Sequence, residues 1–220
     1  APALYRKYGV KRGLRNDNGT GVLVGLTTIG NVHGYVMDEG EKQPIPGELY
    51  YRGINVKDIV AADRREHRFG YEETAYLLLF GELPTAKELG DWKNTIGAYR
   101  KLSDGFRDNA IMKYPSKNLM NALARAVLFA YAFDPEGNPD DISLEKCLEQ
   151  SIDLIGSIPT IAAYAYQAKA HYHDGASLMI RNPDPKKSTS ENILMLTRED
   201  GRYTKLEAEN YKKLIVSYSR

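Results

Sequence analysis

The sequence contains little cysteine and almost no net charge. Cys147 is the single cysteine among 220 residues, so the chain cannot form an internal disulfide. Chains of this kind are typical of a reducing compartment, and we expect the protein to be cytoplasmic. The 30 basic and 29 acidic residues give a net charge of +1, which provides no general reason to expect nucleic acid as a partner.

Long hydrophobic runs are also missing. The longest apolar run, residues 126–133, is far shorter than the roughly 20 residues that a membrane-spanning helix needs. The N-terminal stretch APALYRKYGVKR has no apolar segment of the kind found in signal peptides. Hydrophobic residues make up 42% and charged residues 27%, the balance of an ordinary globular protein. We therefore expect no membrane as a partner.

Common catalytic motifs are missing too: we find no phosphate-binding glycine loop, no zinc-type cysteine spacing and no nucleophile elbow. His171 and His173 stand two residues apart and would share a face only in an extended segment. We expect them to be polar side chains on the last turn of a helix. Cys147 is predicted to be a small core residue. The sequence thus predicts no catalytic residue and no metal ligand.

Two acidic pairs and one basic cluster were considered as sites. Glu72-Glu73 and Asp140-Asp141 stand at helix starts or in loops, where solvated caps are expected rather than acid/base catalysts. The KRGLR stretch, residues 11–15, puts three cations around a glycine and could hold a phosphate. A solvent-facing arm is the alternative, and the pattern by itself favours it.

Glycine and β-branched residues are concentrated near the N-terminus. Residues 1–53 are predicted to form an arm followed by a small β meander, with turns at 38–40 and 44–47. No alternation of strands and helices follows, which argues against a parallel nucleotide-binding sheet.

From residue 54 to 208 the patterns are helical, so the fold class is mainly α. Helix starts are predicted at Asn55, at Thr85 with Glu88, at Ser143, at Ser190, and at Thr204 with Glu207. Pro159 is predicted to kink or split the helix that contains it. The segment SKNLMNALARAVLFAYAF is apolar nearly all round, which predicts a central core helix or a helix in a subunit interface.

Several stretches in this order resemble the citrate synthase family. They are YRGINVKDIV, YLLLFGELPTAKEL, SIPTIAAYAY and NPDPKKSTSENILMLTREDGRYTKLEA. The resemblance runs from about Val10 to Ala208 and is to the N-terminal half of family members. The sequence is most similar to those of family members from anaerobic Gram-positive bacteria. It implies a citrate-synthase-like helical large domain behind a small β-rich N-terminal segment.

The resemblance also implies an activity and its residues. The family makes citrate and coenzyme A (CoA) from acetyl-CoA, oxaloacetate and water, with two histidines and an aspartate as the catalytic side chains. In family members the first of these histidines belongs to a segment resembling LHADHGGGN, which would begin near Glu209. This chain reads ENYKKLIVSYSR there, and no histidine follows His173. We expect residues 209–220 to be an atypical ending, through frameshift, truncation or a split gene, and this chain to be inactive alone.

Two family contacts can be carried onto this sequence. Arg12, in the glycine-flanked arginine segment, corresponds to a contact with a CoA phosphate, while Leu144 stands where some members have a second CoA-contacting arginine. Acetyl-CoA or CoA is implied as substrate of the complete enzyme, with no tightly bound cofactor. The family's dimers imply a homodimer through helices 118–133 and 144–172.

Two alternatives remain open at this point. The chain could be a non-catalytic helical assembly module, or a split-enzyme subunit that pairs with a separately encoded C-terminal half. Within the enzyme class, a 2-methylcitrate synthase that uses propionyl-CoA is the other candidate.

Overall fold

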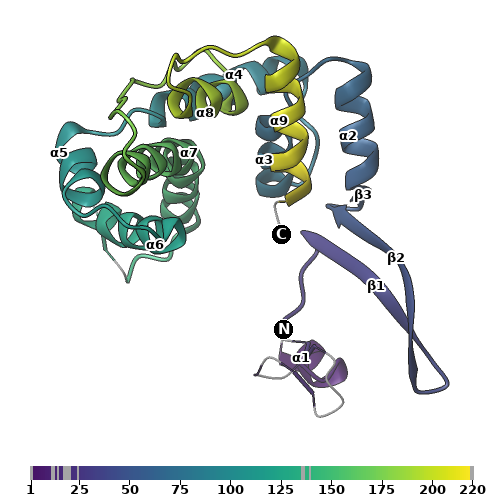
Figure 1. Cartoon of the computed structure of the whole chain (residues 1–220). Helices are drawn as coiled ribbons and strands as arrows, with labels where there is room; N and C mark the ends of the chain where they lie inside the picture. Colours follow the sequence, from purple (N-terminus) through teal and green to yellow (C-terminus); the bar gives the residue numbers. More distant parts are fainter. Residues whose placement is uncertain are drawn as a thin grey trace. The chain divides into compact units, whose positions relative to one another are not determined.

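The chain is described by a computed structural model that covers residues 2–218 except 11, 12, 14, 17–20, 24, 135, 136 and 139. It divides into two compact units, residues 1–59 and 60–220 (Figure 1). The elements are α1 Pro2–Lys7, β1 Gly30–Asp38, β2 Glu41–Tyr51, β3 Ile54–Asn55, α2 Val56–Arg65, α3 Gly70–Phe80, α4 Ala86–Tyr99, α5 Asp104–Phe106, π-helical η1 Arg107–Met112, α6 Leu119–Ala130, 3₁₀-helical η2 Tyr131–Phe133, α7 Leu144–Asp174, α8 Thr189–Thr197 and α9 Lys205–Tyr218.

The first unit contains a three-stranded antiparallel meander in the order β1-β2-β3, as predicted. β1 and β2 form the long ribbon of Figure 1. Glu39 and Gly40 connect them with φ values of 46° and 86°. Two left-handed residues in a tight hairpin turn match the twist of the flanking strands, which explains the turn predicted at 38–40.

The second predicted turn, Pro44–Gly47, is wrong because these residues lie within β2. The pairing passes from His33 opposite Glu48 to Tyr35 opposite Pro44, so residues 45–47 face Gly34 alone and form a bulge. β3 pairs with β2 only at Tyr50 and Tyr51 among the described residues. A proline can therefore occupy this stretch of β2 without breaking a ladder on its other side.

Most predicted helix starts are confirmed by side-chain caps. Thr85 and Glu88 form a full capping box, and Thr204 and Glu207 exchange the same pair of hydrogen bonds at the start of α9. The Asn55 side chain accepts from the Lys57 N–H, and Ser143 accepts from the N–H at position 146.

The predicted cap of α8 is two residues off. Ser188, not Ser190, is the N-cap and forms a capping box with Glu191, while Ser190 is buried inside the first turn. Two helical regions were not predicted: α1, which lies in the predicted N-terminal arm, and residues 104–112. The latter region begins at Ser103, whose hydroxyl accepts from the Phe106 N–H.

The core of the second unit is built on α7, which runs through Pro159 as one helix of 31 residues. Of the predicted kink or split at this proline, the split is therefore wrong. An interior proline costs about 3 kcal/mol. Burial in the turns that follow it offsets that cost: Ile161, Tyr164 and Ala168 are each at most 3% exposed and pack against α6, α8 and η1.

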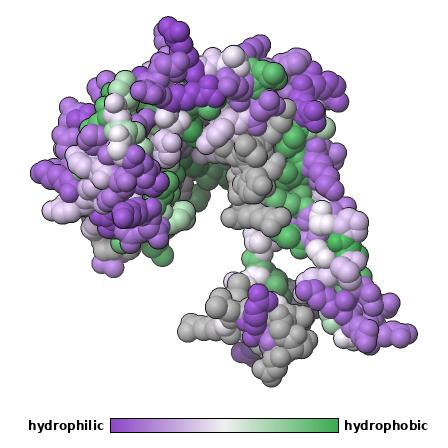
Figure 2. Space-filling view, in the orientation of Figure 1, coloured by the Kyte–Doolittle hydropathy of each residue, from purple (hydrophilic) through white to green (hydrophobic). Residues whose placement is uncertain are grey.

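α6 is not a central helix of this chain. Of its residues only Ala126 is buried, whereas Met120 and Leu128 are 73% and 78% exposed. Cys147, on the first turn of α7, is also exposed, so its predicted core position is wrong. In the view of Figure 2 hydrophilic residues cover most of the helical unit, and hydrophobic ones emerge between them.

Glycines let α4 approach α7 and the loop before α8 closely. A Cβ at Gly156 would lie 2.6 Å from the Tyr99 Cβ, and one at Gly97 would lie 2.4 Å from the Pro185 carbonyl oxygen. By contrast, a Cβ at Gly90, on the exposed face of α4, would meet no atom within 4 Å.

We predict opposite effects of alanine at two of these glycines. Gly156→Ala should destabilise the chain by about 1–3 kcal/mol, because the helices must separate. Gly90→Ala should stabilise it by about 0.5–1 kcal/mol, because alanine loses less backbone entropy in a helix. Urea unfolding measures both, and a stabilising Gly156→Ala would contradict the close approach.

Candidate functional site

The predicted CoA contact Arg12 lies outside the described residues, as does Lys11. The second predicted feature, the histidine pair, lies at the end of α7 as expected. His171 Nδ1 donates to the Ala176 carbonyl oxygen at 2.8 Å, beyond the last turn, while His173 is exposed. Within the described part of the chain, no three His, Cys, Asp or Glu side chains are grouped so that they could hold a metal ion.

The two acidic pairs differ from each other. Asp140 and Asp141 are exposed, and Asp141 caps the loop by accepting from the Ser143 N–H, as predicted. Glu72 and Glu73 are buried, at 0% and 6% exposure, so the prediction that they are solvated caps is wrong. Glu73 accepts from Arg68 Nη1 at 2.6 Å, and Glu72 is the least exposed charged side chain among the described residues.

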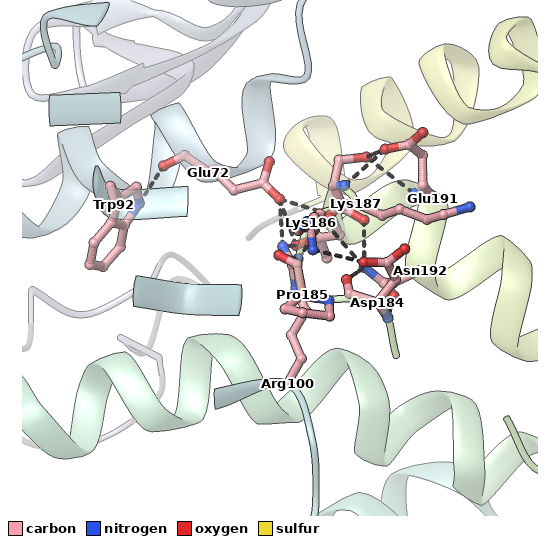
Figure 3. A network of polar contacts seen from close by, with 11 residues as sticks. Glu72, Trp92, Arg100, Asp184, Pro185, Lys186, Lys187, Glu191 and Asn192 are labelled. Atoms are coloured by element: carbon pink, nitrogen blue, oxygen red, sulfur yellow. Dashed lines mark hydrogen bonds and ion pairs between the residues drawn. The ribbon is translucent and has the colours of Figure 1, made fainter. Parts of the chain in front are cut away.

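Glu72 and Arg100 form a buried ion pair between α3 and the end of α4. Arg100 Nη2 donates to Glu72 Oε1 at 3.1 Å, and the two side chains are 3% and 1% exposed. The same oxygen accepts from the Thr189 N–H at 2.8 Å and from its hydroxyl at 2.9 Å. Figure 3 shows Glu72 and Arg100 converging on the loop that precedes α8. Three segments thus meet at one carboxylate oxygen.

Arg100 also holds the loop itself. Its Nη1 donates to the carbonyl oxygens of Pro185, at 3.2 Å, and of Lys187. Asn192, 2% exposed, closes the loop from the other side: its amide donates to three carbonyl oxygens, including that of Asp184 at 2.9 Å, and its oxygen accepts from the Asp184 N–H. Two buried polar side chains, Arg100 and Asn192, therefore hold the loop before α8 from two sides.

A second set of polar contacts joins α8 to α9. Arg198 donates to both carboxylate oxygens of Glu207, and this contact together with the Thr204 hydrogen bonds lowers the pKa of Glu207 to about 2. Lys187 donates to the Tyr203 hydroxyl at 2.9 Å, which raises the Lys187 pKa. α9 is thus held by the same loop and helix that Arg100 positions.

The charged groups of this network hold segments of the chain in position. Burial lowers the pKa of Arg100, while the Glu72 carboxylate opposes that shift. Burial and the Glu72 charge raise the pKa of neighbouring Tyr71 to about 12. Such groups keep one protonation state near neutral pH and do not exchange protons with a substrate. The network fixes helices rather than catalysing a reaction.

Local sequence signals could not reveal this network. Arg100 stands 28 residues and Thr189 117 residues from Glu72, so their meeting depends on tertiary packing. One indirect signal was available. The helix GYEETAYLLLF is apolar on most of its surface, which predicts that it is buried on most sides, so acidic residues in its first turn are expected to be buried as well.

Comparison with known proteins assigns the chain to a family. A sequence profile described as "Citrate synthase, C-terminal domain" matches residues 16–219. The chain belongs to the citrate synthase family. This confirms the resemblance found in the sequence, and the described helices agree with the helical character expected for a portion of such an enzyme.

Two curated relatives match similar shares of the chain. The glyoxysomal citrate synthase of Cucurbita maxima is 30% identical over 156 residues, which are 68% of this chain and 28% of the relative. The 2-methylcitrate synthase 1 of Corynebacterium glutamicum is 29% identical over 161 residues, 72% of this chain and 38% of the relative. The chain therefore spans well under half the length of these family members.

A solved structure supports the fold. The crystal structure of citrate synthase from Pyrobaculum aerophilum superposes with a TM-score of 0.71 at 24% identity, over 96% of this chain and 51% of the other. Among the described helices, none is both long and apolar enough to cross a membrane.

We predict that the buried pair is far more sensitive to substitution than an exposed one. Arg100→Met should cost about 3–5 kcal/mol of unfolding free energy, because it leaves Glu72 charged and unpaired in the interior. Arg65→Met is the control: it removes an ion pair whose side chains are 76% and 46% exposed, and should cost less than about 1 kcal/mol. Glu72→Leu/Arg100→Met should recover part of the loss. Equal effects of the two single substitutions in urea unfolding would contradict this.

Proposed function

We propose that this chain is the N-terminal part of a citrate synthase and that it does not catalyse the reaction by itself. The observation that carries the proposal is the family match over residues 16–219 in a chain that spans 28–38% of the two relatives, and the placement at the N-terminal end rests on the sequence resemblance. In this proposal the chain supplies the helical frame of the large domain, while the acid/base residues come from the rest of the enzyme.

The chemistry of the reaction supports this division. Condensation joins the methyl carbon of acetyl-CoA to the carbonyl carbon of oxaloacetate, and water then cleaves the thioester. A carboxylate must remove a methyl proton while a donor stabilises the enol oxygen. His171 is engaged with backbone, His33 stacks edge-on to Tyr50, and His67 lies 3.6 Å from Glu209 with 72% of its side chain exposed. None of these arrangements is an enclosed acid/base site.

Coenzyme A would contact this chain through Arg12. The support is the resemblance of the KRGLR stretch to the family's arginine segment, together with the density of cations there. We propose acetyl-CoA as the substrate of the complete enzyme and the cytoplasm as its location, the latter from the single, unpaired cysteine.

The alternatives keep specific support. A relative named 2-methylcitrate synthase 1 is as similar as the citrate synthases, which makes propionyl-CoA the second candidate substrate. A split-enzyme subunit or a non-catalytic assembly module is the other candidate, and the exposed apolar faces of α6 and α7 favour a partner in either case.

An activity assay tests the proposal. The purified chain, with acetyl-CoA and oxaloacetate, should release no CoA above the enzyme-free rate, because none of its histidines lies in an enclosed acid/base site. Adding a separately produced C-terminal half of a citrate synthase should restore CoA release, and parallel assays with propionyl-CoA identify the substrate. Robust turnover by the chain alone would overturn the proposal. Co-elution of the halves without turnover would favour the assembly module.

We further propose that the chain forms a homodimer through helices 118–133 and 144–172. The apolar side chains that this pairing would cover are exposed in one chain: Met120, Leu128 and Leu144 are 73%, 78% and 79% exposed. Burying a leucine of this kind contributes about 1.5–3 kcal/mol.

Leu128→Glu should therefore shift the chain from dimer to monomer in light scattering coupled to size-exclusion chromatography. Leu206→Glu, at a residue 65% exposed on α9 and outside both helices, is the matched control and should leave the dimer intact. A wild-type chain that stays monomeric at high concentration would contradict the dimer.

A further inference from the structure

A hollow of about 320 Å³ lies in the second unit, outside the Glu72–Arg100 network. We call it the α7 pocket, since the first half of α7 forms one wall. The end of α4, the turn before α5, and η2 form the others. Its volume is at the lower end of the range for small-molecule sites, enough for a ligand of about one aromatic ring.

The floor of the α7 pocket is apolar and aromatic. Phe106 and Phe133 line it with ring centroids 5.5 Å apart in an edge-to-face arrangement, and Ile161, 1% exposed, lies beside them. Aromatic rings attract organic cations as well as apolar groups, because their faces carry partial negative charge. The floor therefore suits an apolar body that carries a positive charge.

The polar wall has a buried ammonium group that is already neutralised. Lys146, 9% exposed, is 3.3 Å from both Asp134 Oδ1 and Glu149 Oε2. The Gln150 amide donates to the other oxygen of Asp134 at 3.1 Å. An anionic ligand would have to compete with two carboxylates for this one ammonium, so the wall does not favour anions.

Asp153, one turn of α7 beyond these groups, is the third carboxylate of the pocket lining and does not contact Lys146. It lines the pocket, and among the described residues no hydrogen-bond donor or cation contacts it. Its pKa is raised, first by loss of solvent and then by the charges of Asp134 and Glu149. Counting Lys101 at the rim, the pocket is lined by three carboxylates and two ammonium groups, which leaves an excess of negative charge.

We propose that the α7 pocket binds a small organic ammonium ion. The charged head would pair with Asp153, and the apolar body would lie on the floor formed by Phe106, Phe133 and Ile161. A primary amine would donate hydrogen bonds to Asp153, which accepts none from the described residues. Its positive charge would also reduce the repulsion among the three carboxylates. This binding does not rest on the proposed citrate synthase activity, but most of the pocket lining belongs to segments 118–133 and 144–172, which are also proposed to form the homodimer.

The test compares three ligands of one shape on the full chain: benzylamine, benzyl alcohol and benzoate, at neutral pH. Isothermal titration should give benzylamine a dissociation constant at least tenfold lower than either of the others. In amide NMR spectra its shifts should fall on Ser103, Gln150 and Asp153. An eight-heavy-atom ligand of ordinary efficiency binds at about millimolar concentration, so titration to roughly 10 mM is sufficient.

Asp153→Asn should reduce the preference for benzylamine over benzyl alcohol to less than about threefold, because it removes the charge and keeps the shape. Glu145→Gln, on the same helix but outside the pocket lining, is the matched control and should leave the preference unchanged. Circular dichroism establishes that both variants fold. The proposal is overturned if benzylamine does not bind, if it binds no better than the alcohol or benzoate, if its NMR shifts fall elsewhere, or if Asp153→Asn keeps the preference.

Discussion

The packing of the second unit depends on one ion pair removed from water. Placing Glu72 and Arg100 in the interior costs several kcal/mol for each charge, and their attraction alone does not return it. The structure compensates with hydrogen bonds: Glu72 Oε1 accepts from Arg100 and twice from Thr189, and Arg100 donates to the backbone of the loop before α8. α3, α4 and α8 can be brought together here only in the arrangement that satisfies these groups, and the contacts of Arg198 with Glu207 then extend this order to α9.

The second unit is thus stabilised by two kinds of contact: the polar network around Glu72 and Arg100, and the apolar core around α7. The apolar core tolerates some variation in packing, because dispersion and burial have little directional preference. The polar network tolerates little variation, since each donor must lie within hydrogen-bonding distance of its acceptor. This difference explains the close approach at Gly97, where α4 meets the loop: a hydrogen-bonded loop cannot move away to admit a methyl group.

Features coded by neighbouring residues could be predicted from the sequence, and features coded by distant ones could not. Capping at Thr85 and Thr204 was predictable because donor and acceptor are three residues apart. The cap of α8 was also local, and the Glu191 that stands three residues after Ser188 could have identified it. Glu72 was mistaken for a solvated cap because its partners come from other segments. The turn expected at Pro44–Gly47 failed similarly, since only the pairing with β1 shows that these residues form a bulge.

The wrong core position predicted for Cys147 and the absence of a central position for α6 have a different origin. An apolar pattern reports burial in the assembly in which the sequence was selected, whereas exposure is a property of the single chain. Where the two agree, as at Ile161 and Ala168, the chain supplies its own packing partners. Where they disagree, as at Leu128, the uncovered area represents free energy of burial that a further packing partner would recover. The disagreement is therefore informative: it locates on α6 and the start of α7 the faces where a second chain or segment would pack, and it does so without any knowledge of the family.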